Sequence, residues 1–177
     1  MSGLLRYERD ALLFGVARRA LFDRLPRGAL PILKEVARHL LRRPVVGIAA
    51  VARRHDGHIL LVKRGDTGTW GLPGGTMEWG EPARTSLTRE LREEAGATVL
   101  RTGRLVGVFT APERDDRMHG VTIVVEAEVA PELSGPENPI EIHEARFFPP
   151  DALPHPLAFT GDDMVKQALA GGPAYWE

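Results

Sequence analysis

The sequence predicts an α+β fold in which a mixed sheet lies between helices, with a helical extension before it. Short β-branched and aliphatic runs alternate with segments of helical periodicity, but without the strand-helix-strand rhythm of a parallel α/β sheet. With 177 residues, of which 43% are apolar and 27% charged, the chain has the length and composition of one globular domain plus a short extension.

The first 44 residues differ in charge from the rest of the chain. They hold ten lysines and arginines against four acids, a net charge of +6, whereas the remaining residues sum to −7. Apolar residues recur at helical spacing across residues 4–25 and 29–41, with the breaker sequence Pro-Arg-Gly between them. We therefore expect residues 1–44 to form a basic helical extension and residues 45–177 to form the main domain.

Composition excludes several classes of protein. The chain has no cysteine, which rules out disulfides, thiolate metal sites and a cysteine nucleophile, and favours the cytoplasm. The apolar run at residues 11–17 is too short to span a bilayer and leads directly into two arginines. Because the basic extension lacks a clean basic face with interleaved aromatic residues, we favour packing or homodimer formation for it over binding to a membrane surface or to nucleic acid.

The elements of the main domain follow from local patterns. Aliphatic runs at residues 45–52 and 58–63, joined by the turn sequence HDG, predict two antiparallel strands. A helix is expected to begin with Pro82 in its first turn and to end near Gly96. After it we expect strands within residues 99–110 and 119–129, a short strand at 145–148 and a last helix at 162–169.

The helix that begins at Pro82 carries three glutamates on one face. Glu90, Glu93 and Glu94 stand at positions i, i+3 and i+4, so their like charges repel one another. A divalent cation bound between them removes this repulsion, and oxygen ligands of this kind suit Mg²⁺ or Mn²⁺. The alternative is a solvated acidic face balanced by arginines of the same helix, namely Arg84, Arg89 and Arg92.

The stretch around these glutamates, GGTMEWGEPARTSLTRELREEAGA, fits a longer pattern, G-x5-E-x7-R-E-U-x-E-E-x-G-U, where U is aliphatic. The matching residues are Gly75, Glu81, Arg89, Glu90, Leu91, Glu93, Glu94, Gly96 and Ala97. Seven fixed positions, each filled by chance about one time in fifteen, make a coincidence on the order of one in a hundred million. The pattern is the signature of the Nudix hydrolases, and the chain resembles that family over about residues 45–169.

The resemblance implies a Nudix-type mixed sheet sandwiched between helices, and hydrolysis of a nucleoside diphosphate derivative by water with Mg²⁺ or Mn²⁺ as cofactor. Carried over by position, the metal ligands and catalytic carboxylates would be Glu90, Glu93 and Glu94, with the backbone carbonyl of Gly75 as a further ligand. Arg89 would act in catalysis by orienting these carboxylates through ion pairs, and Glu81 would brace the loop.

The loop after the signature favours ADP-ribose as the substrate. Pro112 lies fifteen residues beyond Ala97, and the cluster of acids and arginines that follows is similar to a loop of ADP-ribose pyrophosphatases. In the substrate-binding site, Arg114 and Arg117 would grip phosphate oxygens, and Arg64 would contact a phosphate or the terminal ribose. The alternative is an exposed turn in which neighbouring acids pair with the arginines.

Three further assignments rest on weaker signals. The general base is Glu93 or, from a later loop, Glu141 or Glu144. Trp70 is expected to support the glycine-rich loop from the core rather than to stack on a base. Nucleoside triphosphates, dinucleoside polyphosphates and capped RNA ends are alternative substrates, and a Nudix domain that senses a nucleotide without catalysis is the alternative from another class.

Overall fold

The computed structural model describes Ile32 and residues 43–177. The helical hairpin expected within residues 1–44 lies outside these residues, apart from Ile32 and Arg43, so the extension and the boundary after it stay predictions. Among the described residues, no helix is long and apolar enough to cross a membrane.

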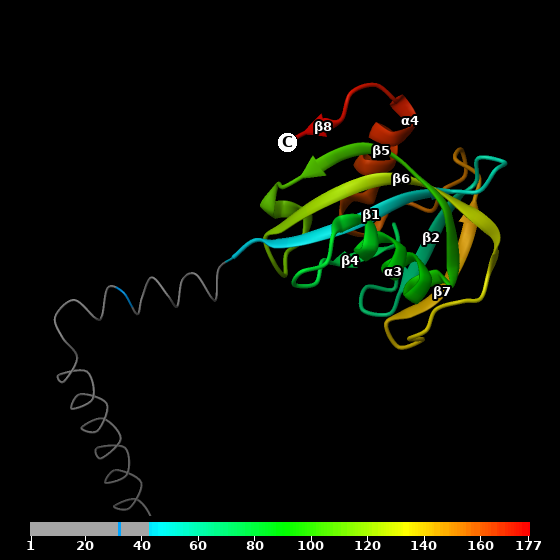
Figure 1. The fold of residues 1–177 in the computed structure, drawn as a ribbon, viewed down its shortest axis with the longest axis horizontal. Coiled ribbons are helices and arrows are strands. Elements are labelled where there is room, and N and C mark those ends of the chain that lie inside the picture. Colours follow the sequence, from blue (N-terminus) through cyan, green and yellow to red (C-terminus); the bar gives the residue numbers. More distant parts are fainter. Residues whose placement is uncertain (1–31, 33–42) are drawn as a thin grey trace, which may run out of the picture. The chain divides into compact units, whose positions relative to one another are not determined.

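A mixed sheet forms the centre of the described domain (Figure 1). Its eight strands are β1 (Val45–Arg53), β2 (Ile59–Arg64), β3 (Trp70–Gly71), β4 (Gly74–Thr76), β5 (Ala97–Phe109), β6 (Gly120–Leu133), β7 (Ile142–Phe148) and β8 (Tyr175–Trp176). They follow the order β3-β2-β1-β6-β5-β8, with β4 paired to β1 and β7 paired to β2. The β1–β6 and β5–β8 pairs are parallel and the others antiparallel.

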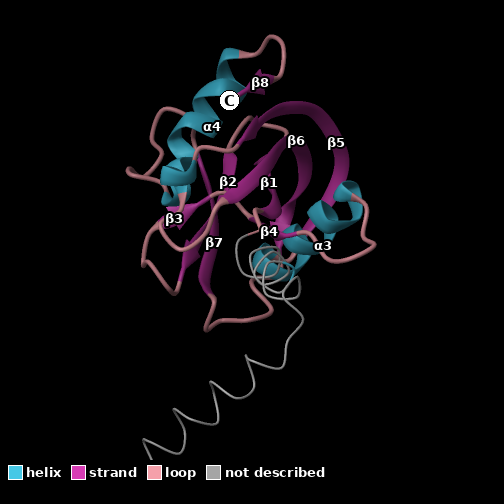
Figure 2. Cartoon of the chain, turned by 90° about the vertical axis from the view of Figure 1, so that its left-hand side faces the viewer, coloured by secondary structure: helices cyan, strands magenta, loops and turns pink. Residues whose placement is uncertain are grey.

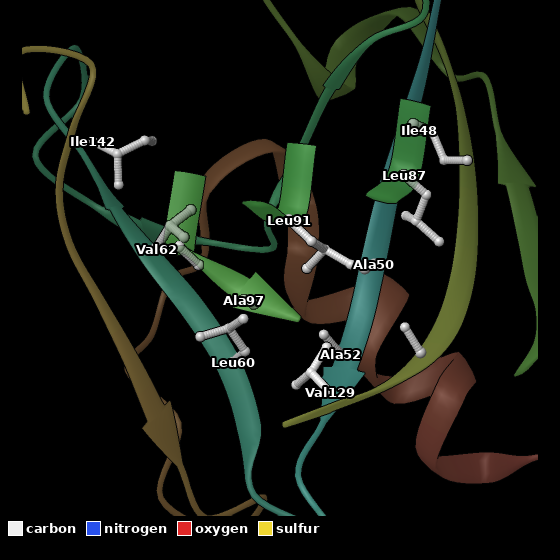
Figure 3. Close-up of a cluster of buried hydrophobic side chains, with 12 residues drawn as sticks. Ile48, Ala50, Ala52, Leu60, Val62, Leu87, Leu91, Ala97, Val129 and Ile142 are labelled. Atoms are coloured by element: carbon white, nitrogen blue, oxygen red, sulfur yellow. The ribbon is translucent and has the colours of Figure 1, made fainter. Parts of the chain in front are cut away.

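Two helices cover opposite faces of this sheet, α3 (Ala83–Ala95) and α4 (Gly161–Ala170), as Figure 2 shows. Successive side chains of a strand point to opposite faces, so β1 serves both helices. Ile48, Ala50 and Ala52 pack in the core under α3, whereas Ala49 and Val51 pack in the core under α4. Figure 3 shows the first core, in which Leu87 and Leu91 of α3 meet the strands.

One edge of β1 pairs with β6 along its whole length, whereas the other edge pairs first with β4 and then with β2. This change of partner positions the glycine-rich loop. The end of β1 at Arg53 pairs with Ile59 of β2, whereas residues 47–49 pair with residues 74–76 of β4. The loop between β3 and β4 therefore joins the sheet at β1, and it brings Gly74 and Gly75 against the carboxylates of α3.

The longer elements agree with the sequence-based expectation, including the antiparallel pairing of β1 with β2. Strands β3, β4 and β8 were not expected. β3 and β4 are two and three residues long and lie in a stretch rich in glycine, where no alternation of apolar side chains marks a strand. They exist because the backbones of β1 and β2 supply hydrogen-bonding partners for them.

Candidate active site

Helix α3 holds two of its three glutamates on the face that it buries. Pro82 caps its first turn, and it ends at Gly96, whose φ of 61° is left-handed and suits glycine. Leu87 and Leu91 anchor the apolar face in the core. Glu90 and Glu94 lie on this same buried face, and the partly exposed Glu93 lies beside them.

The guanidinium of Arg89 contacts Glu81, Glu90 and Glu93, and we call these four residues together with Glu94 the carboxylate cluster. Arg89 donates to Glu81 at 3.1 Å, to Glu90 at 2.8 Å and to Glu93 at 3.3 Å. Glu81 also accepts from the Ser86 hydroxyl at 2.7 Å, and the hydrogen bond from Arg89 holds the pKa of its carboxyl below the usual range. Arg89 therefore orients three carboxylates at once, as the sequence predicted.

Glu94 is held differently, by backbone rather than by a guanidinium. Its Oε2 accepts from the backbone N–H of Gly74 at 2.7 Å. Burial raises the pKa of Glu94 to about 8, and the hydrogen bond from Gly74 is the largest of the effects that oppose this rise. Burial also raises the pKa of Glu90. Two buried carboxyls with raised pKa values are groups that an added cation would stabilise in their charged form.

Gly75 completes this arrangement because it has no side chain. A Cβ at this position would lie 2.5 Å from Oε1 and 2.7 Å from Oε2 of Glu90. The Glu90 carboxylate thus occupies the space that any other residue would fill, directly against the glycine backbone.

The donor set of this cluster fits a hard divalent cation, although its side chains are not gathered around one point. Within residues 43–177, no three acidic or histidine side chains converge as a ready metal site. The reason is that Arg89 holds oxygens of Glu90 and Glu93, while the Gly74 N–H holds one of Glu94. Carboxylate oxygens and a glycine backbone carbonyl are ligands that suit Mg²⁺ or Mn²⁺. The predicted set Gly75, Glu90, Glu93 and Glu94 therefore fits such a cation once carboxylate oxygens leave Arg89 and the Gly74 N–H and turn toward the metal.

A cavity of about 910 Å³ lies beside the cluster, large enough for a nucleotide-sized ligand. Gly75, Arg89, Glu90 and Glu94 contribute to its wall. Its lining also includes the three arginines predicted to bind substrate, namely Arg64, Arg114 and Arg117. The structure therefore brings most of the predicted chemical and substrate-binding residues to one cavity, whereas Glu93 and Pro112 are not part of its wall.

The three arginines meet at one dipeptide, Phe159-Thr160, and together these five residues are called the arginine cluster. The guanidinium carbons of Arg64 and Arg117 lie 4.8 Å and 4.6 Å from the centre of the Phe159 ring. Arg114 donates to the hydroxyl of Thr160. Both residues of the dipeptide have a φ of 54°, a left-handed conformation that costs energy for residues with side chains.

Each of these arginines already has a carboxylate partner. Arg64 donates to Asp66 at 2.9 Å, and Arg117 donates to Asp66 at 2.7 Å and to Asp115 at 2.9 Å. Arg114 donates to Glu177 at 2.6 Å. The pairing of Arg117 with Asp115 was foreseen as the alternative to a phosphate contact, whereas the pairing of Arg114 with Glu177 had no signal in the sequence.

The comparisons with known proteins agree on one family. The model of the NUDIX domain matches residues 41–168. The ADP-ribose pyrophosphatase of Methanocaldococcus jannaschii is 34% identical over 134 residues, which cover 73% of this chain and 76% of that protein. The chain belongs to the Nudix family.

Solved Nudix structures have the same fold. The MutT NUDIX hydrolase from Burkholderia pseudomallei is 32% identical, with a TM-score of 0.63 over 71% of this chain and 98% of that one. The NUDIX domain of Shewanella oneidensis NrtR, complexed with ADP ribose, is 24% identical, with a TM-score of 0.65 over 75% of this chain and 90% of that one. The predictions of a Nudix-type α+β fold and of a Nudix pyrophosphohydrolase are confirmed.

The remaining predicted residues of this Nudix domain separate by position. Glu141 lines the cavity, whereas Glu144 lies on β7 and pairs with Arg146. Pro112 begins the 3-10 turn η1 (Pro112–Arg114), is exposed, and is not part of the cavity wall. Trp70 packs edge-to-face on Phe148 at 4.8 Å beside the core under α4, as expected.

No sequence pattern predicted that Phe159-Thr160 would belong to the site; this dipeptide lies in the 3-10 turn η2 (Ala158–Thr160) before α4. Its left-handed backbone follows from tertiary contacts, because neither residue favours that conformation. The only available signal was its place between a proline-rich loop and the last predicted helix.

Proposed function

We propose that this Nudix protein hydrolyses the pyrophosphate linkage of a nucleoside diphosphate derivative, with ADP-ribose as the favoured substrate and Mg²⁺ or Mn²⁺ as cofactor. The observation that carries the proposal is the single cavity whose wall includes both the α3 carboxylates and the three arginines. A ligand with a charged linkage and a bulky group on either side suits such an arrangement.

The chemistry proposed for the carboxylate cluster follows from its charges. A divalent cation bound there would neutralise phosphate oxygens and acidify the attacking water. Glu90, Glu93 and Glu94 would hold it with the Gly75 carbonyl, and Arg89 would keep Glu90 and Glu93 in place through the ion pairs already present. Burial of Glu90 and Glu94 strengthens their interaction with any bound charge because little water competes.

Two residues are proposed as alternatives for the general base. Glu93 is partly exposed and adjoins the other carboxylates, but it is held by Arg89 and Arg92. Glu141 lines the cavity from the loop before β7 and carries no ion pair among the described residues. Glu144 is the weaker choice because it is paired with Arg146 outside the cavity wall. A proton acceptor must reach the attacking water. Glu141 in the cavity wall and Glu93, which is not part of that wall but shares Arg89 with Glu90, meet this requirement better than Glu144.

Two findings support ADP-ribose over the alternative substrates. A relative 34% identical to this chain is an ADP-ribose pyrophosphatase, and a Nudix domain of the same fold has been solved with ADP ribose. The arginine cluster adds an aromatic ring and guanidinium planes to the cavity, surfaces on which a sugar or base can pack.

A substrate screen tests the proposal. Purified protein with Mg²⁺ is incubated with ADP-ribose, nucleoside triphosphates, a dinucleoside polyphosphate and a capped RNA, and the products are separated by chromatography. AMP and ribose 5-phosphate from ADP-ribose at the highest kcat/KM are expected. A higher kcat/KM for a triphosphate would refute the substrate assignment, and binding of ADP-ribose without turnover of any compound would identify a sensor.

The basic segment before the domain is proposed to act in assembly, in a protein that resides in the cytoplasm. Residues 1–44 precede the whole signature. Their deletion should leave kcat unchanged and alter the sedimentation of the protein if they form a homodimer contact. Loss of activity in a folded, shortened protein would contradict this division of roles.

A further inference from the structure

Strand β8 joins the sheet beside the cavity through a specific fit. Tyr175 and Trp176 pair in parallel with Gly107 and Val108 of β5. The Tyr175 ring lies 5.2 Å from the ring of Phe109, which belongs to the cavity wall. A Cβ on Gly107 would lie 2.7 Å from the Tyr175 carbonyl oxygen, so the glycine leaves the room that β8 occupies.

Glu177, directly after β8, places its carboxylate in a cradle of donors. Its Oε2 accepts from the backbone N–H groups of Thr110 and Ala111, each at 2.6 Å. Its Oε1 accepts from Nη2 of Arg114 at 2.6 Å, and Nε of Arg114 adds a contact of 3.2 Å. The carboxylate thus satisfies two backbone donors and a guanidinium where β5 turns into η1.

Arg114 extends this contact to a third segment. Its Nη1 donates to the Thr160 hydroxyl and to Asp163 of α4 at 3.3 Å, and its guanidinium carbon lies 5.0 Å from the centre of the Phe109 ring. Only 15% of its side chain is exposed. Most of its N–H groups are therefore engaged within the protein, which leaves little capacity for a phosphate.

Arg114 contributes to the cavity wall, whereas Glu177 is not among the described residues that line it. Glu177 can therefore reach a ligand only through the residues that it holds. It fixes the turn at Thr110 and Ala111 directly, and through Arg114 it fixes the start of α4 next to Phe159-Thr160.

We propose that Glu177 is a positioning residue that sets the shape of the arginine side of the cavity and thereby the preference among substrates, without a part in the chemistry. The inference rests on the proposed function, because it concerns the same cavity. In this role, β8 and Glu177 act as a clamp that holds three segments together: the turn after β5, η1 and the start of α4.

The test compares Glu177→Ala and Glu177→Gln with the control Glu113→Gln. Glu113 is an exposed carboxylate in η1, next to Arg114, so its removal changes the charge of this turn but leaves the contacts of Glu177 in place. In Glu177→Ala, KM for ADP-ribose should rise about fivefold to tenfold, kcat should stay within about twofold, and the preference over a nucleoside triphosphate should fall by a similar factor. Glu177→Gln retains the acceptors for Thr110 and Ala111, so a smaller rise is expected.

A second measurement does not depend on turnover. Hydrogen exchange of the Thr110 and Ala111 amides should accelerate in Glu177→Ala and remain unchanged in Glu113→Gln. If the wild-type protein hydrolyses none of the screened compounds, the proposed function fails, and the affinity for ADP-ribose measured by calorimetry then replaces KM. Unchanged KM or affinity and unchanged preference, despite faster exchange, would overturn the inference. A lower KM would also overturn it, since Glu177 would then compete with the ligand for Arg114.

Discussion

The carboxylate cluster and the arginine cluster border the same cavity, yet their charges are balanced in opposite ways. In the described part of the chain, three of the four carboxylates of the first cluster contact the guanidinium of Arg89, and the one other arginine that pairs within the cluster is Arg92, which contacts Glu93. Glu94 has a single backbone N–H. In the second cluster every arginine has at least one carboxylate partner, so its positive charge is already compensated.

This difference separates the requirements of chemistry from those of shape. The carboxylate cluster has an excess of negative charge that is partly buried, and like charges would repel a phosphate unless the proposed cation were bound. The arginine cluster offers little uncompensated charge to a ligand, and its planar groups around Phe159 instead provide a preformed surface. Substitutions in the first cluster should therefore affect kcat, and substitutions in the second should affect KM.

The largest effect is expected from the α3 carboxylates. Glu93→Gln or Glu94→Gln should lower kcat by at least about a hundredfold, because each removes charge that would hold the metal. Chelation with EDTA should abolish turnover, and added Mg²⁺ or Mn²⁺ should restore it. Steady-state kinetics with ADP-ribose measure both effects.

Glu137→Gln is the matched control for this experiment. Glu137 pairs with Arg92, as Glu93 does, but lies outside the carboxylate cluster. Its kcat should equal that of the wild type. Full activity of Glu94→Gln, or full activity in EDTA, would show that the cluster does not hold a catalytic metal.

A smaller loss of kcat is expected from Gly75→Ala, which tests whether the Glu90 carboxylate must lie directly against the backbone of residue 75. The new Cβ would displace the Glu90 carboxylate, the free end of a side chain, so kcat should fall about tenfold while the fold is retained. Gly74→Ala should act differently, because its Cβ would lie 2.2 Å from the backbone oxygen of Ile48. That substitution should destabilise the protein by about 1–3 kcal/mol. Equal melting temperatures for the two variants would contradict the distinction.

The arginine cluster is tested by Arg117→Ala. Removal of this side chain uncovers one face of Phe159 and breaks the ion pairs with Asp66 and Asp115. KM for ADP-ribose should rise about fivefold with kcat nearly unchanged, the pattern of lost uniform binding. Arg101→Ala, which removes an exposed arginine paired with Glu128 on the sheet, is the control and should change neither constant. If Arg117→Ala lowered kcat and left KM unchanged, Arg117 would take part in the chemical step rather than in substrate binding.

The smallest effect concerns stability in acid. The hydrogen bond from Arg114 lowers the pKa of Glu177 from 4.5 to about 2. The stabilisation that this carboxylate gives is complete above pH 4.5 and is lost as the pH falls through 2. Glu177→Gln, which does not titrate, should therefore reduce the drop in unfolding free energy over that window, by on the order of 1 kcal/mol after solvent screening. Identical urea-unfolding profiles for both proteins between pH 5 and pH 2 would contradict the ion pair.

The sequence was sufficient for the part of the site that one helix organises. Glu90, Glu93 and Glu94 lie close together because the period of a helix is fixed, and the Nudix signature singled out Gly75 and Arg89, which the structure places against Glu90. The contacts of Arg89 with three carboxylates follow from the same periodicity and from the short loop before α3.

The other side of the cavity depends on contacts between distant segments, and local patterns could not reveal it. Arg64, Arg114 and Arg117, predicted to bind substrate, line the cavity, but the pairs that join different segments, Arg117 with Asp66 and Arg114 with Glu177, had no local signal. The pairing of Arg114 with Glu177 joins residues 63 positions apart, and no periodicity connects them. The position of Phe159 beside Arg64 and Arg117 likewise depends on tertiary contacts between distant segments, which no local pattern predicts.

The parallel pairing of β1 with β6 has a consequence for how the protein folds. The two strands come from opposite halves of the domain, so the chain must close a long loop before their hydrogen bonds compensate the lost entropy. Contacts between segments so far apart in sequence slow folding. Because Arg114 and Arg117 lie on the connection between β5 and β6, the cavity wall cannot be complete until this pairing has formed. The helix that holds the carboxylates can form early from local contacts, but a folding chain gains its active site only when its second half has been added to the sheet.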